Sequence, residues 1–227
     1  MKLKILFITL LLLMVGCSKE PINYEEMLNE RDGVFYTKDT NEPYSGPVFN
    51  IYENGQNKQE GNFKEGLMNS LWTYYFENGQ MEGQGRFIDG DGGNPSNKSG
   101  IPFNGRVGKW TFWYENGQKK SETNYKDGKS DGLRTEWYEN GQKEFEYNYK
   151  DDKKDGISTK WYENGIKEGE GTFKDGEMDG VQTEWYENDI KKREGTFKDG
   201  KMDGVFTMWD KNGQKMVEKV YKDGNEL

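Results

Sequence analysis

Residues 137–143 read Trp-Tyr-Glu-Asn-Gly-Gln-Lys, and much of the chain consists of variations on this stretch. Tryptophan returns every 24 residues, at Trp113, Trp137, Trp161, Trp185 and Trp209. Self-similarity at a fixed period of this length is the signature of a repeat architecture, in which each unit packs mainly against its neighbours. We therefore expect function to come from a repeated surface rather than from one deep pocket.

Each repeat has the pattern of two short strands. Residues 132–138 and 142–149 alternate with a period of two, which is typical of strands. In the second run this alternation places Lys143, Phe145, Tyr147 and Tyr149 on one face. Asn140-Gly141 lies between them and predicts a tight type I′ turn, because both central residues of that turn need a positive φ. A longer glycine connection, such as residues 127–132, leads from one unit to the next. The sequence predicts an all-β fold: an elongated, single-layer, twisted antiparallel meander of about fourteen strands, built from 24-residue hairpin repeats.

The composition favours such a thin structure. Only 31% of the residues are hydrophobic and 30 are glycine, whereas an ordinary globular domain has about 45–50% apolar residues. Aromatic residues make up 15% of the chain, which argues against disorder. Gly169 and Gly171 occupy strand positions that could have been apolar, and we expect neighbouring Trp and Tyr rings to lie over them.

Several classes of function are disfavoured by composition. The chain has no histidine, the commonest general base and metal ligand, and its single cysteine rules out an internal disulfide or a thiolate zinc cluster. A net charge of −9 disfavours nucleic acid and anionic lipid surfaces as partners. A glycoside hydrolase would need paired carboxylates, but Glu115, Glu139 and Glu163 are repeated residues that need no special role. We expect no enzyme activity, no cofactor and no metal.

The N-terminus has the features of a secretory signal peptide. A basic start is followed by an apolar run over residues 5–15, which is too short to span a bilayer. Residues 13–17, Leu-Met-Val-Gly-Cys, resemble the lipobox of bacterial lipoproteins, with methionine where leucine is most common. This resemblance implies that residues 1–16 are removed and that Cys17 is lipidated as the mature N-terminus. The alternatives are an uncleaved anchor or an ordinary secretory signal with a chance cysteine.

Lipid on Cys17 would anchor the protein through the hydrophobic effect, at about 0.8 kcal/mol per buried CH₂. Removing the signal peptide also removes Lys2 and Lys4, so the mature body would be even more acidic and would stand off anionic head groups. Ser18 follows the cysteine, which in lipoproteins of double-membraned bacteria tends to allow outward sorting. The expected location is the cell envelope, at the outer membrane or cell surface rather than the inner membrane.

The chain divides into a signal peptide (1–16), a lipidated N-terminus with a polar tether (17–32) and a repeat domain (33–227). An insertion near residues 89–104 interrupts the 24-residue period. Its Asp89, Asp91 and Asn94 are residue types that calcium loops use, but the twelfth position, where an EF-hand needs glutamate, is Gly100. A plain flexible loop is therefore the favoured interpretation.

The repeat Gly-x-x-x-x-Trp-Tyr-Glu-Asn-Gly-Gln-Lys…Tyr/Phe-Lys-Asp-Gly resembles the bacterial variant of the MORN repeat over roughly residues 33–224. Residues 108–117 are closest to the family pattern, and Ser70 replaces the first glycine of an earlier unit. The resemblance implies an elongated single-layer twisted sheet. Members of this family are often labelled as antitoxins of toxin–antitoxin systems, and others act as scaffolds.

The expected function is a non-catalytic, protein-binding scaffold or adhesin-like surface on an envelope lipoprotein. Because tryptophan is favoured at interfaces, Trp72, Trp110 and Trp113, which lie close to the insertion, are the candidate partner-binding residues. The alternatives are an antitoxin-like protein that neutralises a toxin, and an envelope protein that binds a glycan along its aromatic rings.

Overall fold

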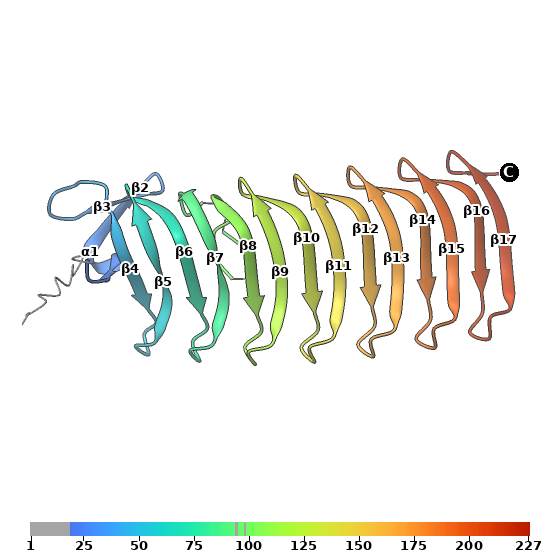
Figure 1. Cartoon of the computed structure of the whole chain (residues 1–227), viewed down its shortest axis with the longest axis horizontal. Helices are drawn as coiled ribbons and strands as arrows, with labels where there is room; N and C mark the ends of the chain where they lie inside the picture. The colour runs from blue at the N-terminus through green and yellow to red at the C-terminus, as the bar shows by residue number, and fades with distance from the viewer. Residues whose placement is uncertain (1–18, 94, 98) are drawn as a thin grey trace, which may run out of the picture.

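The protein is one long β-sheet with little structure outside it (Figure 1). A computed structural model describes residues 19–93, 95–97 and 99–227. Sixteen strands lie side by side in the order β1-β4-β5 and then sequentially to β18, and every neighbouring pair is antiparallel except β1 with β4. The predicted all-β, single-layer meander is confirmed, and the fourteen strands β4–β17 form its body.

The elements within the described residues have the following bounds. The N-terminal part contains β1 (Ile22–Asn23), α1 (Tyr24–Met27), β2 (Leu28–Arg31) and β3 (Val34–Thr37). The next strands are β4 (Gly46–Ile51), β5 (Asn57–Lys64), β6 (Leu67–Tyr75), β7 (Met81–Gly90), β8 (Arg106–Trp113) and β9 (Lys119–Lys126). The sheet continues with β10 (Lys129–Trp137), β11 (Lys143–Lys150), β12 (Lys153–Trp161), β13 (Lys167–Lys174) and β14 (Glu177–Trp185). It finishes with β15 (Lys191–Lys198), β16 (Lys201–Trp209), β17 (Lys215–Lys222) and β18 (Asn225–Glu226).

Each repeat has two turns, and the lengths predicted for them are exchanged: the Asn-Gly turn is the longer one and the Asp-Gly turn is the shorter one. At the Asn-Gly turn, Gly141 has a φ of +84° and its N–H donates to the Tyr138 carbonyl at 2.9 Å. Asn140 is not among the residues with positive φ, so the prediction of a type I′ turn there is wrong. The loop instead has three residues, and the register shifts between Glu136 and Trp137.

The two-residue turn lies at the other edge of the sheet. Asp127 and Gly128 both have positive φ, +50° and +77°, as a type I′ turn requires. The register then shifts between Ser130 and Arg134, where Gly132 has a φ of +100°. This bulge accounts for the extra residues that made the Asp-Gly connection look long in the sequence.

Hydrogen bonds join each repeat to the next along both edges of the sheet. The hydroxyl of Tyr138 donates to the Trp161 carbonyl at 2.8 Å, and Tyr114, Tyr162 and Tyr186 make the same bond one repeat along. At the opposite edge, the N–H of Gly176 donates to the Lys154 carbonyl at 2.8 Å. The repeated residues therefore hold neighbouring units in register.

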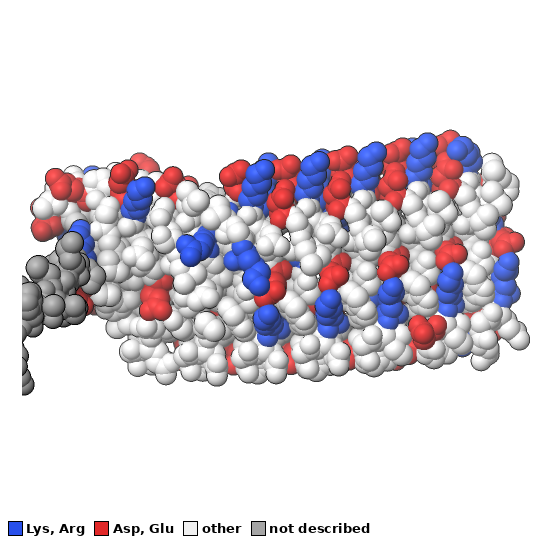
Figure 2. All heavy atoms as spheres, in the orientation of Figure 1, with Lys and Arg blue, Asp and Glu red and all other residues white. Residues whose placement is uncertain are grey.

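One face of the sheet carries regular rows of charge (Figure 2). In each repeat from β8–β9 onward, a lysine at the start of the second strand pairs with the glutamate three residues later, as in Lys143 with Glu146 at 2.6 Å. The same pair recurs on β9, β13, β15 and β17. These pairs are largely exposed, so each contributes little stability. We call this the charged face and the other the aromatic face.

The buried core lies on the aromatic face of the N-terminal half. The buried hydrophobic residues form a single cluster between Leu28 and Tyr125. Residues 22–37, the N-terminal cap, cover the first part of this cluster: the Phe35 ring stacks on Phe63 at 4.5 Å, and Tyr24 meets both rings edge-on. The prediction that residues 17–32 form a polar tether is therefore wrong for residues 22–31, which pack on the sheet.

The insertion covers the next part of the same face. Ile101 is 1% exposed, and its Cδ1 lies only 2.8 Å from the place where a Cβ on Gly83 would stand. The Arg106 guanidinium follows, over the rings of Phe103 and Trp110 at 4.1 and 4.5 Å. The expectation of a plain flexible loop is thus wrong for residues 101–103, which close the core. Among the described residues, none covers the aromatic face beyond this point in the way that Ile101 does.

Candidate functional site

Trp72 and Trp110 are core residues rather than surface anchors. They are 1% and 0% exposed, and their indole N–H groups donate to the Asn62 and Arg86 carbonyls, both at 3.1 Å. Each ring lies flat over a glycine: a Cβ on Gly61 or Gly85 would stand 2.2 or 2.1 Å from the indole. The prediction that these two tryptophans bind a partner is corrected, because their faces are already used inside the protein.

Trp113 is half-buried and lines a hollow of about 530 Å³ beside the insertion. The later repeat tryptophans are also half-buried, and a lysine from the preceding repeat lies over each ring, as with Lys143 over Trp161 at 5.5 Å. Because a lysine lies over each of these tryptophan rings, the row of repeat tryptophans has a structural role. Of the three predicted anchors, Trp113 is the one that reaches the edge of a hollow.

The hollow beside the insertion is dominated by Arg106. Its Nε, Nη1 and Nη2 donate to the Pro102 carbonyl (2.6 Å), the Tyr125 hydroxyl (3.1 Å) and the Ile101 carbonyl (3.1 Å). Burial lowers the pKa of Arg106, and Tyr125 partly offsets this. Burial also raises the pKa of Glu82, which lines the same hollow. Arg106 therefore fastens the insertion to the sheet with donors that a ligand would otherwise use.

A second hollow, which we call the C-terminal groove, lies on the uncovered aromatic face over β11–β16. It encloses about 290 Å³. Gly169, Gly171 and Gly195 form its floor, because they have no side chain to fill the space between aromatic walls. The walls and ends are made by Phe145, Tyr147, Lys154, Phe173, Met178, Phe197, Met202 and Phe206.

The glycines of the groove floor differ in their cover. Gln182 lies against Gly171, and the Phe206 ring is 3.1 Å from where a Cβ on Gly195 would stand. At Gly169 the nearest atoms to such a Cβ are the Thr183 carbonyl oxygen at 3.7 Å and Glu184 Cγ at 3.8 Å. The expected aromatic cover is therefore wrong for Gly169 and Gly171, although it holds for Gly61 and Gly85.

Lys154 brings a cation into this groove. Its Nζ lies 3.9 Å from the centre of the Tyr147 ring and 5.1 Å from that of Phe173. Burial lowers the pKa of Lys154, with a smaller opposing effect from Glu136. Within the part of the chain that the structure describes, no carboxylate lies within salt-bridge distance of this ammonium group.

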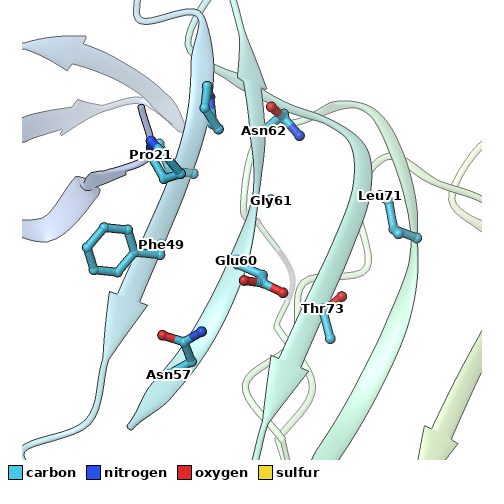
Figure 3. Close-up of a pocket in the computed structure, with 10 residues that line it drawn as sticks. Pro21, Phe49, Asn57, Glu60, Gly61, Asn62, Leu71 and Thr73 are labelled. Atoms are coloured by element: carbon cyan, nitrogen blue, oxygen red, sulfur yellow. The ribbon is translucent and has the colours of Figure 1, made fainter. Parts of the chain in front are cut away.

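A third hollow, of about 560 Å³, opens at the N-terminal end of the sheet (Figure 3). Pro21 and Phe49 lie on one side of it and Leu71 and Thr73 on the other, with Glu60 between them. The Glu60 carboxylate already accepts a hydrogen bond from the Tyr75 hydroxyl at 2.6 Å. This hollow is wide and open, and it carries less convergent chemistry than the C-terminal groove.

The residues considered for catalysis or calcium binding take part in structural hydrogen bonds. The main-chain carbonyls of Glu115, Glu139 and Glu163 accept hydrogen bonds from the asparagine of the preceding repeat, at 3.2, 3.5 and 3.2 Å. Asp91 accepts hydrogen bonds from Gly93 and Asn104. Among the described residues, no three His, Cys, Asp or Glu side chains gather as metal ligands do.

Cys17 and Asn94 lie outside the described residues. Within residues 19–93, 95–97 and 99–227, no helix is long and apolar enough to cross a bilayer.

Sequence reasoning found part of the groove and missed its centre. It placed Lys143, Phe145, Tyr147 and Tyr149 on one face. The three rings do stack or meet edge-on, at 5.2 and 6.1 Å, whereas Lys143 pairs with Glu146 on the charged face. Sequence reasoning did not single out Lys154, because a lysine in a charged turn region looks like an ordinary solvated side chain. The available signal was its position: Arg106 occupies the same place two repeats earlier.

The model of the MORN repeat variant matches six segments of the chain: residues 68–89, 106–127, 130–151, 154–175, 178–199 and 202–223. Together these segments make up more than half of the sequence. The gap between the first two contains the insertion. No curated protein matches this sequence.

Proposed function

This chain belongs to the MORN repeat variant family, and from that premise we propose that it is a non-catalytic scaffold that binds a protein partner on its aromatic face. A repeat sheet offers an extended binding surface of this kind. The partner would lie along β11–β16, where the rings of the repeats stay half-exposed.

One observation carries this proposal. The same aromatic face is covered by the chain's own segments over β5–β9, through Phe35 and Ile101, and is left open over β11–β16. The covered part demonstrates what the face can hold, because both covering segments pack side chains into it. An uncovered row of aromatic rings beside glycines is a surface that gains by the same kind of packing.

We also propose that lipid on Cys17 holds the protein at the cell envelope, with an adhesin-like role for the exposed sheet. The support is the lipobox resemblance of residues 13–17. The test is fractionation of cells that express the wild type or Cys17→Ala. Anchoring predicts that the wild type is found in membranes and that Cys17→Ala is released; membrane retention of both would contradict it.

Partner binding is tested with a photo-crosslinking amino acid in place of Ser158, which lines the groove. The matched control places it at Thr172, which is exposed on the charged face of the neighbouring strand. We expect a discrete crosslinked protein from position 158 and none from position 172. Equal crosslinking from both faces would contradict the proposal. If the captured protein is a toxin, the antitoxin-like role replaces the adhesin-like one.

A further inference from the structure

We infer that the C-terminal groove binds an irregular peptide segment that carries a carboxylate next to a large apolar side chain. This inference rests on the proposed function and names the chemistry of its partner. It comes from two positions in the groove, Gly169 and Lys154, and from what the chain itself places on the equivalent positions nearer its N-terminus.

The first position is the open floor at Gly169. Gly83 and Gly169 stand at the same place in their repeats, the sixteenth residue of the matched segments 68–89 and 154–175. Over Gly83 lies the aliphatic side chain of Ile101, delivered by an irregular segment. Over Gly169 there is no such side chain within 3.4 Å of where a Cβ would stand. The groove therefore has room for one apolar side chain at this point.

The second position is the cation at Lys154. Arg106 is the first residue of β8 and Lys154 is the second residue of β12. Both hold the same place in the repeat, as the first residues of the matched segments 106–127 and 154–175. The irregular segment over β8 supplies two main-chain carbonyl oxygens to Arg106, from Ile101 and Pro102. Lys154 has aromatic rings beside it instead. Because Lys154 lines the groove, an oxygen atom that enters the groove could accept a hydrogen bond from its ammonium group.

The charges around the groove favour a carboxylate rather than a neutral carbonyl. Three basic and two acidic residues line the groove of a chain whose net charge is −9. Lys160 is already paired with Glu168 at 2.7 Å, and Arg193 is paired with Glu184. Lys154 is therefore the lining cation, among the described residues, that an incoming carboxylate would meet unpaired.

The size of the groove limits the partner to a segment. Its volume of about 290 Å³ is at the low end for ligand pockets, which hold about 300–1,000 Å³. This space fits a large side chain and its flanking backbone, while a folded surface would touch only the rims. The partner segment is thus expected to insert as residues 101–103 do over β7–β8.

The test uses the full chain and two fluorescein-labelled peptides in an anisotropy titration. One peptide, Gly-Ile-Pro-Phe-Asp-Gly, keeps the Ile-Pro-Phe order of residues 101–103 and adds a carboxylate; the other has lysine in place of aspartate. We expect the aspartate peptide to bind and the lysine peptide to bind at least about tenfold more weakly. Failure of the aspartate peptide to bind, or equal binding of both, overturns the inference.

Two variants of the chain locate the peptide. Gly169→Leu places a side chain on the groove floor; Gly169 does not have a positive φ, and a Cβ there would make ordinary contacts. We expect at least a tenfold loss of affinity, whereas Thr172→Leu on the opposite face leaves affinity unchanged. Lys154→Gln should reduce the preference for the aspartate peptide to less than threefold, and exposed Lys153→Gln should preserve it. Unchanged peptide binding by Gly169→Leu overturns the inference.

The outcomes separate this inference from the proposed function. If crosslinking from position 158 is observed and the peptides do not bind, the proposed scaffold function is supported and the inferred peptide chemistry is wrong. If crosslinking is absent while the peptides bind with the expected pattern, the groove chemistry stands and the cellular partner is in question. Chito-oligosaccharide that displaces the peptide and binds with higher affinity would assign the groove to a glycan and overturn the inference.

Discussion

At the scale of single residues, glycines within the strands have different physical roles. Gly85 is required because the Trp110 ring occupies the space of its missing Cβ, at 2.1 Å. Gly169 stands two places earlier in its own repeat and has no ring over it. The difference comes from the facing strand, which presents tryptophan to one glycine and a charged side chain to the other.

A matched pair of alanine substitutions tests this difference. Gly85→Ala forces the Trp110 ring away from a well-packed site, and we expect a loss of about 1–3 kcal/mol in the free energy of unfolding. Gly169→Ala meets no close atom, and we expect a change between zero and a gain of about 1 kcal/mol. Denaturant titration followed by tryptophan fluorescence measures both. Equal destabilisation by both substitutions would show that the ring over Gly85 does not determine the stability lost in Gly85→Ala.

A second prediction concerns Asp189, which replaces the glycine of the Asn-Gly loop and has a φ of +62°. Left-handed backbone costs a non-glycine residue about 1–2 kcal/mol, so Asp189→Gly should stabilise β14 and β15 by up to about 1 kcal/mol. The reverse change in the equivalent loop, Gly165→Asp, should destabilise by a similar amount. Hydrogen exchange of the two hairpins reports both changes, and protection that moves the same way in both variants would contradict this account.

At the scale of elements, the N-terminal cap covers the first part of the aromatic face and is joined to the sheet through β1, which pairs with β4. It is held by ring contacts of Tyr24 and Phe35 and by a hydrogen bond from the Asn50 amide to Glu25 at 2.6 Å. Burial raises the pKa of Tyr24 to about 12, and the Glu25 charge adds to this effect. The phenol is therefore strongly favoured in its neutral form while the cap is docked.

This shift predicts a dependence on alkaline pH. Because the pKa of Tyr24 is higher in the folded state than its usual value of 10.0, its contribution is complete below pH 10 and is lost as pH rises toward about 12. Thermal unfolding followed by near-UV circular dichroism at pH 9, 10 and 11 should show falling stability of the cap. Tyr24→Phe should weaken that dependence, with Tyr36→Phe as a control for a tyrosine outside the core cluster. An unchanged dependence in Tyr24→Phe would count against the buried phenol as the cause.

At the scale of the whole molecule, stability is distributed unevenly along a uniform-looking sheet. The cluster of buried hydrophobic residues runs from Leu28 to Tyr125, and later repeats rely on edge hydrogen bonds, the buried threonines Thr135, Thr159, Thr183 and Thr207, and half-exposed rings. In a repeat protein each unit contacts mainly its neighbours, so such a difference is not averaged over the chain.

Unfolding is therefore expected to occur in more than one step. Amide hydrogen exchange should show stronger protection in β6–β8 than in β14–β17, because the first group has its aromatic face covered and the second does not. Denaturant should melt the C-terminal repeats first. Uniform protection with a single cooperative transition would show that the sheet acts as one unit despite its one-sided core.

The sequence by itself determined the repeat, its strands and the two faces of the sheet, because strand alternation and turn chemistry depend on residues close together in the chain. The 24-residue period and the Asn-Gly and Asp-Gly pairs were sufficient for this, although the lengths of the two turns were exchanged. Tertiary structure alone decided which side chains are free. Trp72 and Trp110 disappear into the core, residues 22–37 and 101–103 cover one end of the aromatic face, and Gly169 and Lys154 are left open. Such cover depends on contacts between segments far apart in the chain, and a local repeat carries no record of where those segments fold back.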